Sequence, residues 1–301
     1  MSDDDALVFT GERFTPECVR EIWYEHWHRY VFARRFSAGK RVLDAACGEG
    51  YGSALLAERA AEVTGVDVDP ASITHACTRY ASLPRLRYEC ADATALPYAD
   101  GAFDLVVSFE TLEHLAAQEQ LLAGFARVLT DDGVLLISSP DKRTYSELAG
   151  FRNEFHVREL YREQLLDLLQ PHFPHIRLYG QKLLFQSALW ALDSPMGQAE
   201  VATATQGDGA TAVGFDYAPM YYLAVCSRRP LPDTLPALSL FGDREESVYT
   251  HYNHEIRKNM SAGTRIAELE AEVNQLRARV PTTPTQTLAP QRHEWRWWRR
   301  N

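Results

Sequence analysis

The residues best suited to bind a ligand lie in one short stretch, residues 42–52. Asp44 comes first, and Gly48, Gly50 and Gly52 follow it. Glycine has no Cβ, so the backbone of such a stretch can approach a ligand closely. The spacing is not the G-x-G-x-x-G of dinucleotide-binding turns, and the stretch lacks the Lys-Ser/Thr pair of a phosphate-binding P-loop. We therefore expect a ligand-binding turn that combines an acid with closely approaching backbone.

The elements around this stretch alternate between apolar runs typical of strands and amphipathic runs typical of helices. Expected strands cover residues 41–46, 63–68, 86–90, 103–109, 134–138 and 220–226, and expected helices cover residues 20–36, 53–61, 71–81, 118–129 and 160–169. Such alternation favours parallel strands with right-handed crossovers, and continuous apolar strands are buried on both faces. The pattern predicts an α/β fold with a doubly wound, mostly parallel sheet. Residues 194–214, rich in Gly, Ala and Thr, predict a loop.

Further acids accompany the later strands. Asp67 ends the second strand, Asp92 follows the third and Glu110 follows the fourth. In open α/β sheets, ligands bind beyond the carboxyl ends of the strands. We therefore expect these acids to share one edge of the sheet with Asp44.

Residues 42–52 resemble motif I of the class I, Rossmann-like, S-adenosylmethionine-dependent methyltransferases, in the form V-L-D-x-x-C-G-x-G. Residues 39–140 are similar to the later motifs of that family in order, including Glu113-His114-Leu115 after the fourth strand. The resemblance implies a seven-stranded sheet and an enzyme that transfers the methyl group of S-adenosyl-L-methionine, its cofactor.

The resemblance also implies which residues touch the cofactor. Asp67 would accept both ribose hydroxyls, which suits a carboxylate because it can take two O–H donors. Asp92 would accept from the adenine amino group, and Glu110 would lie beside the methionine part. The full set that the resemblance implies is Asp44, Ala46, Gly48, Gly50, Tyr51, Asp67, Val68, Asp92, Ala93, Phe109 and Glu110.

Histidines are the candidates for the acceptor side. A hydroxyl acceptor needs a base, whereas a carboxylate acceptor needs none, and His is the usual base near neutral pH. His114 follows the fourth strand and His156 follows the fifth on the same edge, so both are predicted as catalytic residues. His26 and His28 in the first helix are further candidates. Each of the four could instead be a structural histidine that hydrogen-bonds backbone.

A second resemblance bears on the acceptor. Residues 11–17 and the sequence Glu25-His26-x-x-Arg29-Tyr30 resemble methyltransferases of bacterial surface-polysaccharide gene clusters. This implies O-methylation of a sugar hydroxyl in polysaccharide or glycan biosynthesis. Two alternatives stay open: a methyltransferase for a small molecule such as a quinone, polyketide or other natural product, and a scaffold that only binds the cofactor.

Composition limits the remaining classes. The formal net charge of −10 argues against a nucleic-acid partner, because phosphates attract clustered Lys and Arg. The five cysteines show no C-x-x-C spacing, which favours reduced thiols over disulfides or zinc, and no metal site is predicted. The acidic first residues lack the basic region of a signal peptide, and no apolar run approaches the ~18 residues of a membrane span. We expect a cytoplasmic protein.

The chain is predicted to divide into five parts. They are an N-terminal cap (1–36), a methyltransferase domain (37–229), a linker (230–263), a coiled coil (264–280) and a flexible tail rich in Trp and Arg (281–301).

The coiled-coil segment predicts self-association. Its apolar residues are spaced three and four apart and form an a/d seam: Ile266, Leu269, Val273, Leu276 and Val280. β-branched residues at a with Leu at d favour a parallel homodimer. The alternative is a helix that packs on its own domain. The Trp and Arg of the tail favour a membrane surface or a protein as a further partner, with a peripheral membrane location.

Overall fold

The computed structural model describes residues 21–189, 191–193, 200–204 and 211–279. The chain forms two compact units, residues 1–245 and 246–301. Residues 11–17, Val280 and the tail 281–301 lie outside the described residues, so the expectations placed on them stay predictions.

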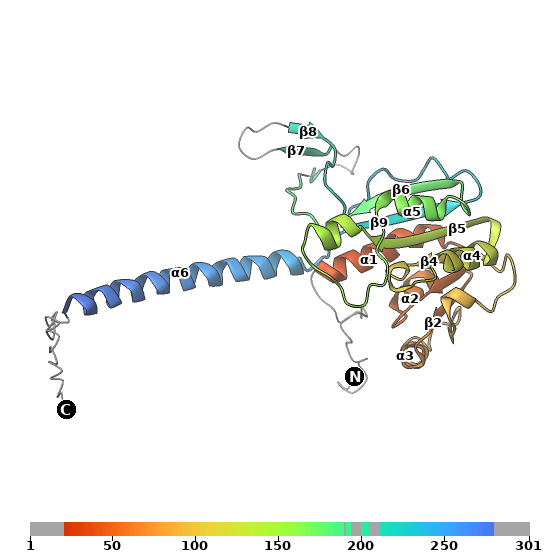
Figure 1. Cartoon of the computed structure of the whole chain (residues 1–301), viewed down its shortest axis with the longest axis horizontal. Coiled ribbons are helices and arrows are strands. Elements are labelled where there is room, and N and C mark those ends of the chain that lie inside the picture. The colour runs from red at the N-terminus through yellow and green to blue at the C-terminus, as the bar shows by residue number, and fades with distance from the viewer. Residues whose placement is uncertain (1–20, 190, 194–199, 205–210, 280–301) are drawn as a thin grey trace, which may run out of the picture. The chain divides into compact units, whose positions relative to one another are not determined.

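A seven-stranded sheet forms the centre of the first unit, in the order β3-β2-β1-β4-β5-β9-β6 (Figure 1). The strands are β1 (Arg41–Ala45), β2 (Glu62–Asp67), β3 (Leu86–Cys90), β4 (Phe103–Ser108), β5 (Leu129–Pro140), β6 (His175–Gln181) and β9 (Tyr221–Ser227). Neighbours are parallel from β3 to β5, whereas β9 is antiparallel to both β5 and β6. The order reverses between β1 and β4, where doubly wound sheets bind ligands. The predicted doubly wound, mostly parallel sheet is confirmed.

Helices flank the sheet: α1 (Glu21–Ala33), α2 (Tyr51–Ala57), α3 (Pro70–Arg79), α4 (Gln118–Val128) and α5 (Arg162–Leu169). Successive strand residues point to opposite faces, so each strand contributes to two cores. Leu43 and Val106 share one core with α4 and α5. Val42 and Val107 share the other with α1 and α2. One-turn helices cover Arg34–Phe36, Ala93–Ala95, Leu112–His114 and Arg143–Glu147.

Some strands were not expected from the sequence. β6 lies at the edge of the sheet and is only partly buried, so it lacks the continuous apolar run of an inner strand. Short strands β7 (Ala202–Ala204) and β8 (Thr211–Val213) pair as a hairpin inside the segment 194–214, which was expected to be a loop.

The first part of the expected linker packs on the domain instead. Leu235 is buried in the same core as α1. Phe241 lies with its ring centroid 5.4 Å from that of Trp23, and the Tyr179 hydroxyl donates to the Pro236 carbonyl at 2.9 Å. The expectation of a linker from residue 230 was therefore wrong for residues 231–241. The prolines there end regular secondary structure, but the apolar side chains between them still pack in the core of the first unit.

The second unit contains one long helix, α6 (Ser247–Arg279), which begins inside the segment expected as linker. The last proline before it is Pro236 and the next is Pro281, so no proline interrupts a helix over residues 247–280. Four described seam residues are 42–56% exposed: Ile266, Leu269, Val273 and Leu276. Arg265, which flanks the seam, pairs with Glu268 of its own helix at 2.9 Å. The coiled-coil dimer stays a prediction.

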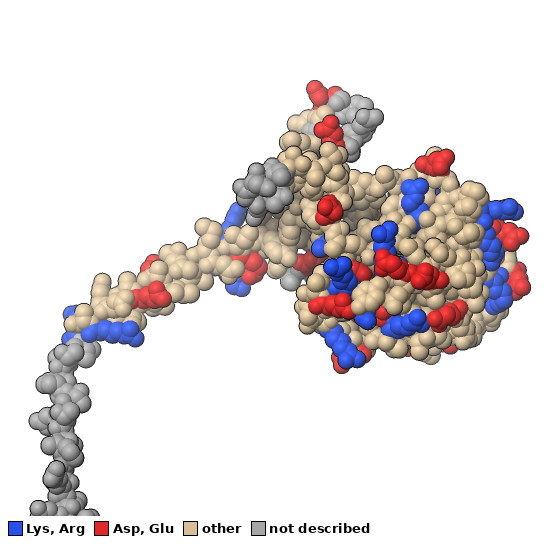
Figure 2. Space-filling model, turned by 45° about the horizontal axis from the view of Figure 1, so that its top comes forward, with Lys and Arg blue, Asp and Glu red and all other residues tan. Residues whose placement is uncertain are grey.

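Acidic and basic side chains lie side by side on the face of the first unit shown in Figure 2. Some of the unit's exposed charges pair, as in Arg41–Asp104 and Arg158–Glu119, each at 2.9 Å. Exposed pairs of this kind contribute at most about 1 kcal/mol each. The expectation that nucleic acid is no partner stays a prediction.

Two further observations bear on the expected environment. Among the described residues, no helix is both long and apolar enough to cross a membrane. The four described cysteines are free thiols: Cys47, Cys77, Cys90 and Cys226. The cytoplasmic location stays a prediction.

Candidate active site

The turn after β1 adopts backbone conformations that favour glycine. Ala46, Gly48 and Gly50 have φ of 59°, 56° and 93°. Left-handed backbone strains a residue that carries a Cβ, so Ala46 must be held there by its surroundings. Tyr88 of β3 donates to the Gly50 carbonyl at 2.6 Å, and a Cβ on Gly50 would lie 2.7 Å from the Tyr88 hydroxyl oxygen. The turn is thus preorganised by the neighbouring strands.

Asp67, at the end of β2, braces this turn with its carboxylate. One oxygen accepts from the Gly48 N–H and the other from the Asp69 N–H, both at 2.9 Å. A carboxylate has about four lone-pair sites, so two stay available for the hydroxyls of a vicinal diol. This geometry fits the ribose role that the sequence implied.

Asp44, at the end of β1, is fully buried. It accepts from the Ser53 hydroxyl at 2.6 Å and from the Tyr30 hydroxyl at 3.1 Å. Burial raises the pKa of Asp44 to about 7, against the effect of these hydrogen bonds and with a smaller contribution from the Asp67 charge. Two carboxylates that disfavour each other's charge suit a cationic ligand, and the sulfonium of S-adenosylmethionine is a cation. The residues present therefore fit that cofactor.

The predicted adenine contacts lie at the ends of β2 and β3. Asp92 caps the turn that begins at Ala93, accepting from the Thr94 N–H at 2.8 Å. Val68 is 70% exposed, so its side chain offers apolar surface to a ligand. Together with Asp44 and Asp67, these residues share one edge of the sheet, as expected.

Helix α1 covers the turn from the other side. Gly52 lets Tyr30 pack closely, because a Cβ there would lie 2.1 Å from the Tyr30 ring. The Tyr51 ring stacks on Trp27 with centroids 5.3 Å apart, and Phe109 meets Tyr30 edge to face at 5.0 Å. Tyr51 and Phe109, both predicted to touch the cofactor, are thus held against the N-terminal helix.

Glu110 follows β4 with φ of 51°, a strained value for a residue with a side chain. Its backbone N–H donates to the Ser138 hydroxyl at 3.0 Å, and that hydroxyl donates to Glu110 Oε1 at 2.6 Å. Arg29 of α1 is buried, lies 3.5 Å from Glu110 Oε1 and donates to Gln181 Oε1 at 2.7 Å. Arg29 therefore ties α1 to the ends of both β4 and β6.

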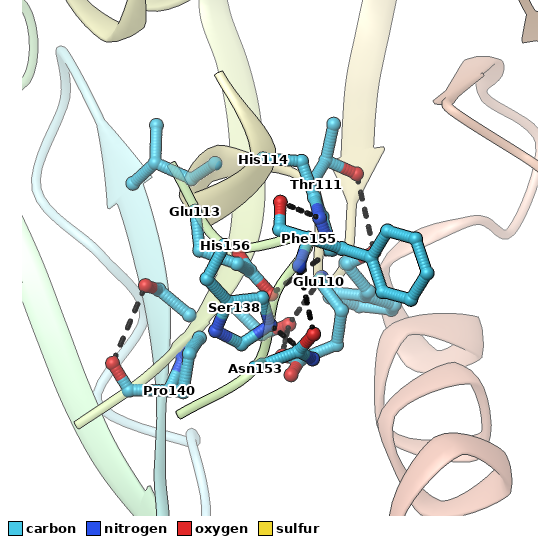
Figure 3. Close-up of polar contacts among 12 residues, drawn as sticks. Glu110, Thr111, Glu113, His114, Ser138, Pro140, Asn153, Phe155 and His156 are labelled. Atoms are coloured by element: carbon cyan, nitrogen blue, oxygen red, sulfur yellow. Dashed lines mark hydrogen bonds and ion pairs between the residues drawn. The ribbon is translucent and has the colours of Figure 1, made fainter. Parts of the chain in front are cut away.

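The two histidines predicted as catalytic lie together beside Glu110 (Figure 3). The ring centroids of His114 and His156 are 5.0 Å apart. His156 Nδ1 lies 2.6 Å from Glu159 Oε1, and the His156 ring stacks on Tyr145 with centroids 5.3 Å apart. The structure thus assembles a polar acceptor edge from segments that follow β4 and β5.

Glu113 completes a possible metal-ligand group that the sequence did not suggest. Ligand atoms of Glu113, His114 and His156 all lie within 4.8 Å of one another. No metal site was predicted, because His156 is far from the other two in sequence. The adjacent residues Glu113 and His114 were the available signal.

His28 is not part of this edge. Its Nε2 lies 3.0 Å from the Ser239 hydroxyl, and its ring stacks on Phe241. Burial, and then the Arg29 charge, lower the pKa of His28 to about 4. Burial also lowers the pKa of His26. Burial thus favours the neutral form of both histidines, and their role as structural residues stays a prediction.

Comparisons with known proteins show the family of this chain. A family model described as a methyltransferase domain matches residues 43–137. A probable S-adenosylmethionine-dependent methyltransferase of Mycolicibacterium smegmatis is 39% identical over 178 residues, which cover 56% of this chain and 68% of that protein.

Further relatives are matched over less of their length. A Mycobacterium tuberculosis protein named in the same way is 38% identical, with 54% of this chain and 60% of that protein covered. A ubiquinone biosynthesis O-methyltransferase of Idiomarina loihiensis is 34% identical, with 40% and 50% covered. The chain belongs to the S-adenosylmethionine-dependent methyltransferases, enzymes whose methyl donor is S-adenosyl-L-methionine.

Proposed function

We propose that this chain O-methylates a sugar hydroxyl in glycan biosynthesis. The observation that carries the proposal is the group Glu113, His114 and His156 beside Glu110, at the edge where the cofactor residues converge. A hydroxyl acceptor must lose its proton during transfer, and this group can bring that about. A carboxylate acceptor needs no such group.

The hydrogen bonds around His156 favour such a role. The Glu159 carboxylate can only accept, so Nδ1 of His156 carries the hydrogen and Nε2 carries the lone pair. A carboxylate behind an imidazole fixes the tautomer and orients the ring. His156 is therefore held by the fold with the orientation that proton chemistry requires.

The surroundings of the group suit a sugar. Polar side chains of α1 and β6 lie near Glu110: Arg29 is 3.5 Å from Glu110 Oε1 and donates to Gln181 Oε1, and burial raises the pKa of Glu25 to about 7. Tyr145 and Tyr221 add aromatic faces, with ring centroids 5.8 Å apart. Sugars combine hydroxyls that need hydrogen-bond partners with C–H faces that pack on aromatic rings.

The transfer itself is an in-line displacement. The acceptor oxygen forms a bond to the methyl carbon, the carbon–sulfur bond breaks, and its electron pair stays on sulfur. The hydroxyl proton is lost to solvent at the edge that carries Glu113, His114 and His156. Positioning of the two reactants supplies much of the rate. Arg29 and Ser138 fix the side chain of Glu110, the residue proposed to lie beside the methyl donor.

A second candidate is O-methylation of a phenolic or quinol hydroxyl. The 34% identity to the ubiquinone biosynthesis O-methyltransferase favours it. The test is to incubate the full chain with S-adenosylmethionine and either nucleotide sugars and glycans or catechols and quinols. S-adenosylhomocysteine release and product mass are then measured. Methylation of phenols alone would refute the sugar proposal, and cofactor binding without any transfer would favour the scaffold alternative.

A further inference from the structure

Glu113 has a feature that the methyl-transfer proposal leaves unexplained. Its side chain is 1% exposed, and within the described part of the chain neither carboxylate oxygen accepts a hydrogen bond. A buried carboxylate without partners costs several kcal/mol unless another group offsets it. The site is thus short of a positive charge at this point.

The two neighbouring histidines present lone pairs toward the same place. His114 Nδ1 lies 3.1 Å from the Phe155 carbonyl oxygen, which can only accept, so Nδ1 carries the hydrogen, and in the neutral imidazole Nε2 carries the lone pair. Nε2 of His114 lies 3.9 Å from Glu113 Oε1. His156 has the same tautomer, because Glu159 takes the hydrogen of its Nδ1. A carboxylate or carbonyl behind each imidazole is the arrangement that orients metal-binding histidines.

The Asn153 side chain contacts the proposed ligand atom of His156. Its Oδ1 accepts from the Phe155 N–H at 3.0 Å, which leaves Nδ2 facing His156 Nε2, also at 3.0 Å. The amide therefore donates to the lone pair that a cation would take. Asn153 therefore competes with a cation for Nε2 of His156, and its side chain must move when the cation binds.

We propose that Glu113, His114 and His156 form a binding site for a divalent first-row transition-metal cation. Two imidazoles and one carboxylate suit Zn²⁺, Co²⁺ or Fe²⁺ better than Mg²⁺ or Ca²⁺, which prefer oxygen ligands. Three protein ligands leave open positions for other oxygens. If the acceptor is a hydroxyl compound, as proposed above, the cation lowers the pKa of the hydroxyl that it binds.

The test uses the full chain, treated with a chelator and freed of it by dialysis. Co²⁺ is titrated while its visible absorption is recorded, and Zn²⁺ binding is measured by calorimetry. We expect one cation per chain, with affinity lowered at least about a hundredfold in Glu113→Gln and in His156→Asn. Glu159→Gln should lower it about 10–100-fold, the usual effect of losing an orienting partner. Asn153→Ala should leave the affinity equal or raise it.

Matched controls are Glu163→Gln and His254→Ala, which replace the same residue types at exposed positions. They should bind the cation like the wild type. If the wild type binds no cation, or if Glu113→Gln and His156→Asn bind it unchanged, the proposal is wrong. The wild-type titration tests the proposal even if a variant does not fold. Because no acceptor is present in these titrations, they are independent of the O-methylation assay, and either proposal can fail alone.

Discussion

Replacing Asp67 with Ala tests the cofactor site most directly. The carboxylate braces the turn through Gly48 and Asp69 and has lone pairs left for two ribose hydroxyls. Hydrogen bonds to a charged group contribute about 1.5–3 kcal/mol. At about 1.4 kcal/mol per factor of ten, Asp67→Ala should weaken cofactor binding roughly ten- to a hundredfold.

The assay is calorimetric titration with S-adenosylhomocysteine, which avoids turnover. Asp69→Ala is a matched control, because Asp69 lies two residues further on and caps α3 by accepting from Ala71 and Ser72. Its loss should lower the free energy of unfolding by about 1 kcal/mol, as for other N-caps, and leave the affinity nearly unchanged. Unchanged affinity in Asp67→Ala, or an equal loss in both variants, would refute the assignment of Asp67 to the ribose.

His156→Asn should lower turnover by about 10²–10⁴ while S-adenosylhomocysteine affinity stays within a few-fold; steady-state assays that show unchanged turnover would exclude His156 from the acceptor chemistry. Burial holds the pKa of Asp44 at about 7 in the folded chain. An unfolded Asp titrates near 3.9, so cofactor-free stability falls as pH rises from about 4 to 7. Asp44→Asn removes this loss. The free energy of unfolding of Asp44→Asn, measured with urea and taken relative to that of the wild type, should rise by at least about 1.4 kcal/mol between pH 5 and pH 8. A difference between the two proteins that does not change with pH would contradict the reasoning. Leu269→Asp combined with Leu276→Asp should reduce an oligomer to a smaller species in light scattering, because charge enters the seam; a monomeric wild type would rule out the homodimer.

The cofactor side could be predicted from the sequence because its contacts are short in sequence. Asp44 bonds Ser53 nine residues away and Tyr30 fourteen residues away, and Asp67 reaches Gly48 across nineteen residues. Two strands, one turn and two helices carry these contacts. The resemblance of residues 42–52 to motif I was enough to predict Asp44 and Asp67 as cofactor residues, although their hydrogen-bond partners were not predicted.

The acceptor side depends on contacts that no local pattern reports. His114 meets the Phe155 carbonyl 41 residues away, and Arg29 meets Gln181 across 152 residues. Glu113 was read only as part of a family motif, since its proximity to His156 arises from the folding of the segment after β5. The coarse order of strands was predictable, whereas the pairing of particular side chains on the edge was not.

Arg29 shows how the two sides depend on each other. Its guanidinium is buried between Glu110, Gln181 and the ring of Tyr221, whose centroid lies 4.5 Å from Cζ. If Arg29 were removed, Glu110 would lose the positive charge that compensates its carboxylate. The Glu110 and Glu113 carboxylates would then disfavour each other's negative charge. The N-terminal helix is therefore more than a cover for the cofactor turn. It supplies the positive charge that lets two acids occupy the acceptor edge, and the proposed cation at Glu113 would supply the second.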